Sequence, residues 1–115
     1  MFLNQYYACM QGNREGLLAF YNDASHMTYT SQQYHGVKEI KNKIESFSFQ
    51  SIKFENMNSD VQEGPLPGSI MVFVTGYLEM DGNSQEQFRF SQVFNLAPNG
   101  QGGFYIHNDI FSIIM

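Results

Sequence analysis

The sequence has a single cysteine, no tryptophan and only 6 basic side chains among 115 residues. One cysteine excludes an internal disulfide. No run of about 18 apolar residues is present, which excludes a membrane-spanning helix. The basic residues are outnumbered by 11 acidic ones, and the resulting net charge of −5 argues against non-specific binding of nucleic acid, which needs a basic surface.

The length and the aromatic content indicate one packed domain. Charged residues make up only 15% of the sequence and hydrophobic residues 43%, which excludes a disordered chain. A chain of this length matches a single domain, so we expect residues 1–115 to form one unit. Eleven Phe and seven Tyr residues favour β-strands and a large packed interior.

The first half of the sequence carries the spacing of three helices. Apolar residues recur at helical spacing in residues 3–10, and Gly12 follows as a stop signal. Asn13 is a candidate cap for a second, short helix. A short β-rich piece, His26–Ser31, comes next, and residues 37–47 predict a third, amphipathic helix of about 10 residues.

From residue 49 the hydrophobic period changes to the two-residue alternation of strands. Turn signals at residues 63–68, Asp81-Gly82 and Pro98-Asn99-Gly100 separate four strand candidates. The first candidate begins at Phe49, and the others are Ser69–Met80, Glu86–Ala97 and Phe104–Met115. These strands are longer than average, so we expect a strongly curved sheet.

Helices followed by a meander of strands predict an α+β fold, with three N-terminal helices packed on a strongly curved antiparallel sheet. Such a sheet, wrapped over a helix, forms a cone with a cavity. The strand around residues 71–74 is apolar on both faces. Because no second domain is available to cover the outer face, we expect a homodimer. The alternative is that Val74 and Tyr77 are scattered surface residues.

Metal binding and nucleophilic catalysis find little support. The three histidines, His26, His35 and His107, are far apart and share no metal-ligand spacing, so no metal site is predicted. Cys9 lies in an apolar helical segment without a basic neighbour, and we interpret it as structural. No catalytic residue is therefore assigned from the sequence.

Acid–base chemistry in a cavity remains open as an alternative. Tyr29, Asp81, His107 and Asp109 are the side chains that could meet near a cavity mouth. A carboxylate in an apolar cavity next to a tyrosine donor is how some small isomerases work. Nothing in the spacing places these residues together.

Charge is distributed unevenly along the chain. Residues 54–115 carry seven acidic side chains and one basic side chain, Arg89. Glu79, Asp81 and Glu86 gather around one predicted hairpin tip. An acidic rim beside an aromatic cavity suits a partner that offers a ring flanked by Lys or Arg, because the ring supplies buried area and the charges supply orientation. The alternative is an ordinary solvated hairpin tip.

Several short motifs along the chain occur together in one known family. They are Phe2 with Tyr6-Tyr7, Tyr21-Asn22-Asp23-Ala24-Ser25 with Thr28, Gln32-Gln33-Tyr34-His35-Gly36 with Ile40, Phe49-Gln50-x-Ile52, Gly76, Phe90-x-Gln92-x-Phe94 and Asn108-Asp109-x-Phe111. In this order they resemble the nuclear transport factor two family over essentially the whole chain. The wider superfamily of this fold includes enzymes, so the fold alone does not imply transport.

The resemblance implies a cone-like fold, a homodimer joined through its sheets, and a non-enzymatic carrier without a cofactor. It further implies binding of the GDP form of the small GTPase Ran and its import through nuclear pores, with a location in cytoplasm, nucleus and nuclear envelope. In the family, an aromatic ring of Ran enters the hydrophobic cavity, and acidic rim residues hold the flanking basic side chains. Carried over here, the cavity residues are Tyr29, Phe47, Phe49, Ile52, Leu78 and Met80, and the rim residue is Asp81.

The sequence also departs from the family. Thr30 and Asn83 stand at two positions where the family has rim acids, and Glu86, in a loop about two residues longer, is the candidate substitute. The family binds phenylalanine-glycine repeats of nucleoporins through an aromatic residue that would lie before Met1. The alternative function is a small-molecule-binding or enzymatic member of the fold, such as an isomerase or dehydratase, with a desolvated acid or base at the cavity floor. A third is a dimerisation module of a larger scaffold.

Overall fold

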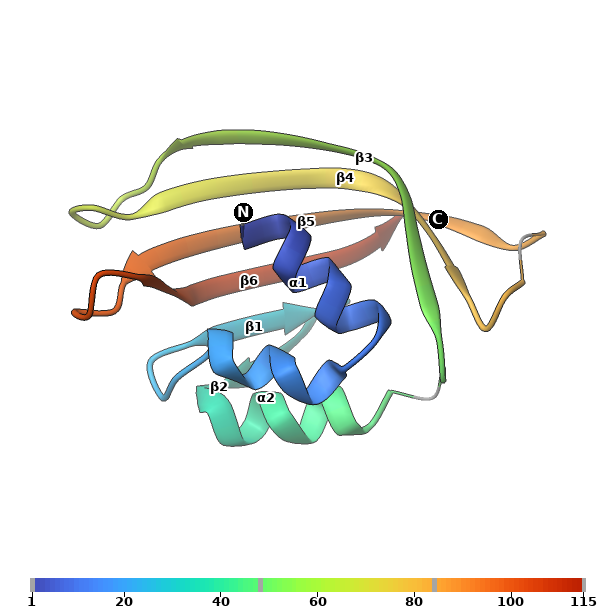
Figure 1. Cartoon of the computed structure of the whole chain (residues 1–115), viewed down its shortest axis with the longest axis horizontal. Helices are drawn as coiled ribbons and strands as arrows, with labels where there is room; N and C mark the ends of the chain where they lie inside the picture. Colours follow the sequence, from blue (N-terminus) through green and yellow to red (C-terminus); the bar gives the residue numbers. More distant parts are fainter. Residues whose placement is uncertain (1, 48, 84, 115) are drawn as a thin grey trace.

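A computed structural model describes residues 2–47, 49–83 and 85–114 of the chain. The helices are α1 (Phe2–Gln11), the 3₁₀ helix η1 (Arg14–Phe20) and α2 (Gly36–Glu45), and the strands are β1 (His26–Tyr29), β2 (Gln32–His35), β3 (Ile52–Glu63), β4 (Ile70–Met80), β5 (Gln87–Pro98) and β6 (Phe104–Ile114). The predicted α+β class, with three N-terminal helices on one curved sheet, is confirmed (Figure 1). The predicted end of the last strand, Met115, lies outside the described residues.

The six strands form one sheet in the order β2-β1-β6-β5-β4-β3. Strands β3 to β6 pair in antiparallel fashion, as the meander predicts, whereas β1 pairs with β6 in parallel. Strand β2 was not predicted. It follows β1 through a two-residue turn in which Thr30 and Ser31 have φ of 45° and 76°. Neither residue is a glycine, so this turn lacks the usual hairpin signal.

The helix boundaries agree with the hydrophobic spacing, but one predicted cap is wrong. Asn13 makes no side-chain hydrogen bond to the turn that follows it, and that turn is a 3₁₀ helix rather than an α-helix. At α2, Glu39 in the first turn accepts a hydrogen bond from the backbone N–H of His35 at 2.8 Å. Within the described parts of the chain, no helix has the length and apolarity needed to cross a bilayer.

The inner face of the sheet packs against α1, which crosses the strands in Figure 1. Along β4, Val72, Val74 and Leu78 are buried, whereas the alternating Phe73 and Tyr77 are 44% and 37% exposed. Helix α1 contributes three buried side chains to the same core, Tyr6, Tyr7 and Met10. The period-two pattern therefore assigns the inner and outer faces correctly.

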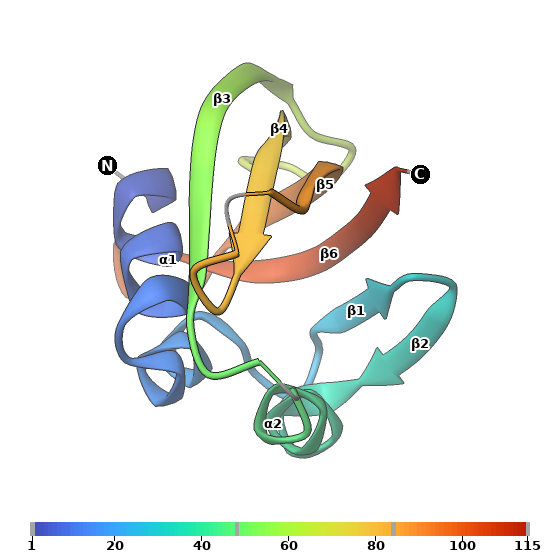
Figure 2. The same cartoon turned by 90° about the vertical axis from the view of Figure 1, so that its right-hand side faces the viewer.

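The sheet bends where β3 carries a bulge, between Glu55 and Asn58 (Figure 2). Opposite the bulge stands Gly76 of β4. A Cβ atom at this position would lie 3.0 Å from Met57 Cγ, 3.1 Å from the Glu55 carbonyl oxygen and 3.1 Å from a ring carbon of Phe90. The bend brings the backbone too close to its neighbours for any side chain, which explains a lone glycine in a long strand.

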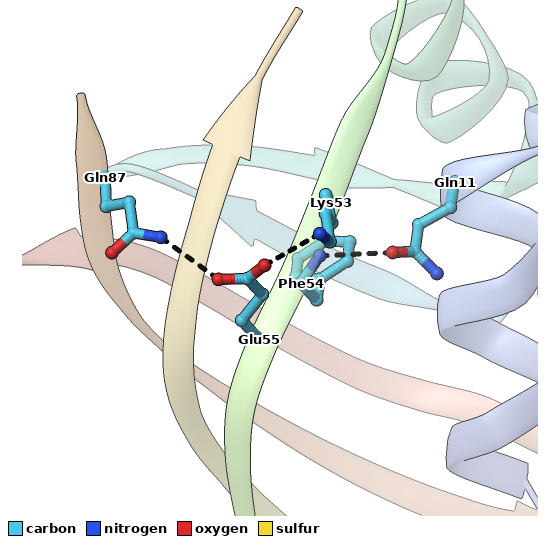
Figure 3. Close-up of polar contacts among 5 residues, drawn as sticks. All are labelled: Gln11, Lys53, Phe54, Glu55 and Gln87. Atoms are coloured by element: carbon cyan, nitrogen blue, oxygen red, sulfur yellow. Dashed lines mark hydrogen bonds and ion pairs between the residues drawn. The ribbon is translucent and has the colours of Figure 1, made fainter. Parts of the chain in front are cut away.

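Polar contacts fasten this bend to its surroundings (Figure 3). The Gln11 side chain at the end of α1 accepts the Phe54 N–H at 3.1 Å. Glu55 pairs with Lys53 at 2.9 Å and accepts a hydrogen bond from Gln87 Nε2 of β5 at 3.0 Å. The Lys53 ammonium lowers the pKa of the Glu55 carboxyl. One helix end and two strands are thus joined at the point of greatest curvature.

We expect Gly76→Ala to destabilise the protein by about 1–3 kcal/mol, because the added methyl group overpacks the bend. Urea unfolding monitored by circular dichroism measures the loss. Thr75→Ala is the control, since it changes the neighbouring residue without adding an atom to the crowded inner face. Equal urea midpoints for Gly76→Ala and the wild type would show that the bend accommodates the added methyl group and would contradict this explanation.

Candidate functional site

A row of aromatic rings lies at the end of the core near β1 and α2. The ring of Tyr29, at the end of β1, lies 5.2 Å from that of Phe47, which stacks on Phe49 at 5.1 Å. Tyr29 also stacks on Phe111 at 5.1 Å with the planes only 9° apart. This stacking follows from the parallel register of β1 and β6, which sets Tyr29 beside Phe111. We call Tyr29, Phe47 and Phe49 the aromatic row.

The six predicted cavity residues divide into two groups. Tyr29 and Phe47 are half-buried and line a small internal cavity together with Phe111. Ile52 and Met80 face each other across β3 and β4, next to the buried Leu78. These three residues and Phe49 belong to or pack against the core but do not line the cavity.

The cavity is closed in this structure. Its volume is about 10 Å³, which is space for no more than one water molecule. The expectation of an open cone is therefore not met in the described conformation. The side chains of Tyr29 and Phe47 form part of the cavity wall.

A buried carboxyl lies at the floor of this cavity. Asp109 is 1% exposed, and its Oδ2 accepts hydrogen bonds from the hydroxyls of Tyr21 at 2.6 Å and Tyr6 at 3.4 Å. Gln92 Nε2 donates to Asp109 Oδ1 at 2.8 Å, and Gln92 Oε1 accepts from the Tyr7 hydroxyl at 2.7 Å. The cluster joins α1, the end of η1, β5 and β6.

Burial dominates the protonation of this cluster. It raises the pKa of Asp109 to about 6, although the donors Gln92, Tyr21 and Tyr6 partly oppose the shift by stabilising the carboxylate. Burial, reinforced by the Asp109 carboxylate, also raises the pKa values of Tyr6 and Tyr21 well above 10. The phenols therefore stay neutral and act as donors.

The rim residue Asp81 lies in the β4–β5 loop and is exposed. Its Oδ1 accepts the backbone N–H groups of Gln50 at 2.8 Å and Ser51 at 3.0 Å, which lowers the pKa of Asp81, with a smaller contribution from Arg14. Asp81 thus ties the β4–β5 loop to the segment that leads from Phe49 into β3.

The two other acids of this hairpin differ in their surroundings. Glu86 is exposed, whereas Glu79 is nearly buried and faces Lys53 across the strands. Only Asp81 and Glu86 therefore present carboxylates to solvent at the tip. The structure brings Asp81 next to the aromatic row through Gln50, but it does not place Glu86 there.

Two cations rest on the aromatic row, which the sequence analysis did not foresee. The Arg14 guanidinium lies 4.6 Å from the Phe49 ring centre and donates to the Gln50 carbonyl at 3.0 Å. Lys43 Nζ lies 4.8 Å from the centre of the Tyr29 ring. The amphipathic spacing of residues 37–47 predicts the helix, but spacing within one helix does not show which strand end lies beside Lys43.

The three histidines come together although the sequence separates them. His26 and His35 face each other across β1 and β2 with their rings stacked at 4.3 Å, and His107 lies 6.1 Å from His26. His107 forms a hydrogen bond of 2.9 Å with the Tyr105 hydroxyl. No group of three His, Cys, Asp or Glu side chains among residues 2–47, 49–83 and 85–114 has the arrangement of a metal site.

The four residues proposed for acid–base chemistry are not assembled into one site. Asp109 lies at the cavity floor and Tyr29 in its wall, but Asp81 belongs to the distant loop contact and His107 to the histidine group. The buried polar cluster that the sequence analysis missed consists of Tyr6, Tyr21 and Gln92 around Asp109. One signal pointed to it, since Gln92 is a polar residue on the inward phase between Phe90 and Phe94.

Known proteins match this chain over nearly its whole length. The family model described as the nuclear transport factor 2 (NTF2) domain matches residues 1–113. Nuclear transport factor 2B of Arabidopsis thaliana is 40% identical over 113 residues, which cover 97% of this chain and 88% of that protein. A solved structure of nuclear transport factor 2 from Cryptosporidium parvum superposes with a TM-score of 0.91 at 41% identity and covers 98% of this chain and 89% of that chain.

The fold also occurs in more distant proteins. A putative scytalone dehydratase from Novosphingobium aromaticivorans superposes with a TM-score of 0.78 at 13% identity, over 98% of this chain and 79% of that chain. At this identity the likeness shows the shared fold alone.

The raised pKa of Asp109 predicts a stability that falls as pH rises. Below about pH 4 the carboxyl is protonated in both folded and unfolded chains, and its full contribution is present. Between about pH 4 and 6 the folded state holds the proton more tightly, so the free energy of unfolding decreases by about 3 kcal/mol in total. Asp109→Asn should remove this part of the pH profile in urea titrations, whereas Asp60→Asn, on the exposed part of β3, should retain it. A profile of Asp109→Asn parallel to that of the wild type would contradict the assignment.

Proposed function

The chain belongs to the nuclear transport factor 2 family, and on this premise we propose that it is a non-enzymatic carrier that binds the GDP form of the small GTPase Ran and mediates its import through nuclear pores. The observation that carries the proposal is the aromatic row of Tyr29, Phe47 and Phe49 with Asp81 beside it. These residues hold the positions that the family resemblance assigns to the cavity and its rim.

The chemistry of this region suits a ring with a basic neighbour. Stacked rings offer apolar area to a further aromatic side chain. The backbone hydrogen bonds of Asp81 all use Oδ1, so Oδ2 remains for a Lys or Arg of the partner. Arg14 competes for the same carboxylate, because it lies close enough to lower the pKa of Asp81. We therefore expect a modest gain from this ion pair.

The closed cavity requires a movement on binding. A volume of about 10 Å³ admits no aromatic ring. Tyr29 and Phe47 are half-buried and lie at the surface end of the cavity, so a rotation of these side chains opens it. Side-chain rearrangement without backbone movement is common at interfaces.

One observation favours the enzymatic alternative, namely the desolvated carboxyl of Asp109 beneath the cavity. Both carboxyl oxygens, however, accept hydrogen bonds from Tyr6, Tyr21 and Gln92. We therefore assign Asp109 a structural role and retain the carrier as the proposed function.

The proposal includes a homodimer formed by the outer faces of two sheets. Phe73, Val93 and Ile110 lie side by side across β4, β5 and β6, and Phe73 and Ile110 are 44% and 46% exposed. A parallel row contains the exposed Tyr77 and Ile114. The solvent face of an antiparallel sheet is normally polar. Two copies related by a two-fold axis bury both rows against each other.

Phenylalanine-glycine-repeat nucleoporins and a location in cytoplasm, nucleus and the nuclear envelope complete the proposal. They rest on membership of the family. No described residue is assigned to the contact with the repeats.

We expect both Asp81→Asn and Tyr29→Ala to weaken binding of GDP-loaded Ran. Asparagine retains an oxygen for the N–H groups of Gln50 and Ser51, so the fold is kept while the charge is lost. The loss should be about 1 kcal/mol, or up to about 4 kcal/mol if the ion pair is desolvated. Tyr29→Ala should weaken binding with less dependence on salt, because it removes ring packing. Surface plasmon resonance at two salt concentrations measures both effects.

The control is Glu63→Gln, which removes an exposed carboxylate at the far end of β3 from the aromatic row. If both Asp81→Asn and Tyr29→Ala bind GDP-loaded Ran as tightly as the wild type does, the proposed mode of binding is contradicted. GTP-loaded Ran in the same measurement tests the nucleotide preference.

We expect Phe73→Glu to convert the dimer into a monomer. The substitution puts a carboxylate into the centre of an apolar interface, where a buried charge without a partner is strongly unfavourable. Val61→Glu is the control, because Val61 is also exposed and apolar but lies on the inner phase of β3. Sedimentation velocity measures the mass of each variant. A wild type that sediments as a monomer at tens of micromolar refutes the homodimer.

A further inference from the structure

Lys43 occupies an unusual place for a lysine on a helix. It lies in the last turn of α2 and is half-buried. Its Nζ is 4.8 Å from the ring centre of Tyr29, 5.7 Å from that of Tyr34 and 5.8 Å from that of Phe47. The ammonium therefore sits at the surface end of the aromatic row, between β1, β2 and the end of α2.

The neighbouring acid does not neutralise this cation. Glu39 is placed one helical turn before Lys43, which is the favourable spacing for an ion pair. Its Oε1 instead accepts the backbone N–H of His35 at 2.8 Å. Among the described residues, the ion pair within 4.0 Å is that of Lys53 and Glu55. Lys43 thus has rings around it and no carboxylate partner.

Lys43 also forms one wall of a surface groove. The groove lies between β2 and α2 and has a volume of about 430 Å³. It is lined by Gln33, Tyr34, Glu39, Asn42, Lys43 and Ser46. This is enough space for a side chain of a partner, and Gln33, Asn42 and Ser46 can donate hydrogen bonds to a carboxylate. Glu39 is the acid of this lining, and its Oε1 accepts the His35 N–H.

The two ends of the aromatic row differ in charge. Lys43 stands beside Tyr29 without a carboxylate partner among the described residues. The Phe49 end carries both a cation and an anion, because Arg14 lies on the ring and Asp81 lies close to Arg14. A partner that lays a ring on the row therefore meets an unpaired ammonium at one end and a carboxylate with its own cation nearby at the other. Such a pattern selects for orientation as well as for affinity.

We propose that Lys43 is a specificity-determining residue that pairs with an acidic side chain of the partner, which enters the groove between β2 and α2. This inference rests on the proposed function, because it assigns a second charged contact to the same binding region. When the ring enters, the Lys43 ammonium leaves the face of Tyr29 and exchanges a weak contact with the ring for an ion pair.

Three variants test the proposal by binding to GDP-loaded Ran. Lys43→Met keeps the apolar stem and loses the charge, Lys43→Arg keeps the charge, and Lys38→Met removes an exposed charge elsewhere on α2. At low salt we expect Lys43→Met to bind roughly five- to tenfold more weakly, with a smaller salt dependence. Lys43→Arg and Lys38→Met should stay within about twofold of the wild type.

The opposite result is equally informative. Affinity of Lys43→Met equal to or above that of the wild type would show that Lys43 only covers the rings, and the proposal would be overturned. Circular dichroism and unfolding midpoints confirm that each variant is folded before binding is compared.

A second measurement separates this inference from the proposed function. Two short peptides, each with one phenylalanine followed by glutamate or by glutamine, are titrated into the wild type and into Lys43→Met while the amide spectrum is recorded by NMR. We expect the wild type to bind the glutamate peptide several-fold more tightly than the glutamine peptide. Lys43→Met should bind the two peptides with equal affinity. Equal binding of both peptides to the wild type, or no binding of either, overturns the role of Lys43. Absence of Ran binding with a clear glutamate preference overturns the carrier function alone.

Discussion

The buried carboxyl of Asp109 is the interaction on which the two layers of the fold depend. Its hydrogen bonds reach Tyr6 of α1, Tyr21 at the end of η1 and Gln92 of β5, so one group connects the helices to the middle of the sheet. A carboxyl without these donors would be costly to bury. The same register that places Asp109 inside also places Phe111, two residues later, under Tyr29. The position of the aromatic row therefore follows from the polar cluster beneath it.

This dependence gives the buried carboxyl of Asp109 a structural role. Its Oδ2 accepts hydrogen bonds from Tyr21 and Tyr6 and its Oδ1 accepts one from Gln92, so the carboxyl orients the side chains that join the helices to the sheet. One distant neighbour in fold is named a putative dehydratase, and at 13% identity that likeness shows the fold alone. A buried acid inside the cone therefore does not by itself assign a reaction to the chain.

Local patterns in the sequence predicted most of the fold. The features that they did not predict arise from contacts between distant segments. The alternation of β4 and the helical spacing of α2 assigned elements and faces correctly, because each pattern lies within one element. The β1–β2 hairpin was missed, since its turn uses Thr30 and Ser31 at positive φ. The meeting of His26, His35 and His107 depends on strand register, and no spacing along the chain expresses it. The role of the predicted cavity and rim residues stays a prediction. The aromatic row contains Tyr29, Phe47 and Phe49, but a closed cavity was not foreseen.

The charge around the aromatic row was also not predictable from local sequence patterns. The sheet half of the sequence is strongly acidic, and from this the rim was expected to be acidic as well. Folding instead brings Arg14 and Lys43, both from the helical half, onto the rings of Phe49 and Tyr29. The local charge at the aromatic row is therefore set by side chains that approach from another layer, and it includes two cations although the chain is acidic. A cation held on a ring, with the nearest helical acid committed to a backbone N–H, keeps its charge available for a partner. Net charge steers a partner toward a protein, whereas the pairing of individual charges determines which partner binds specifically.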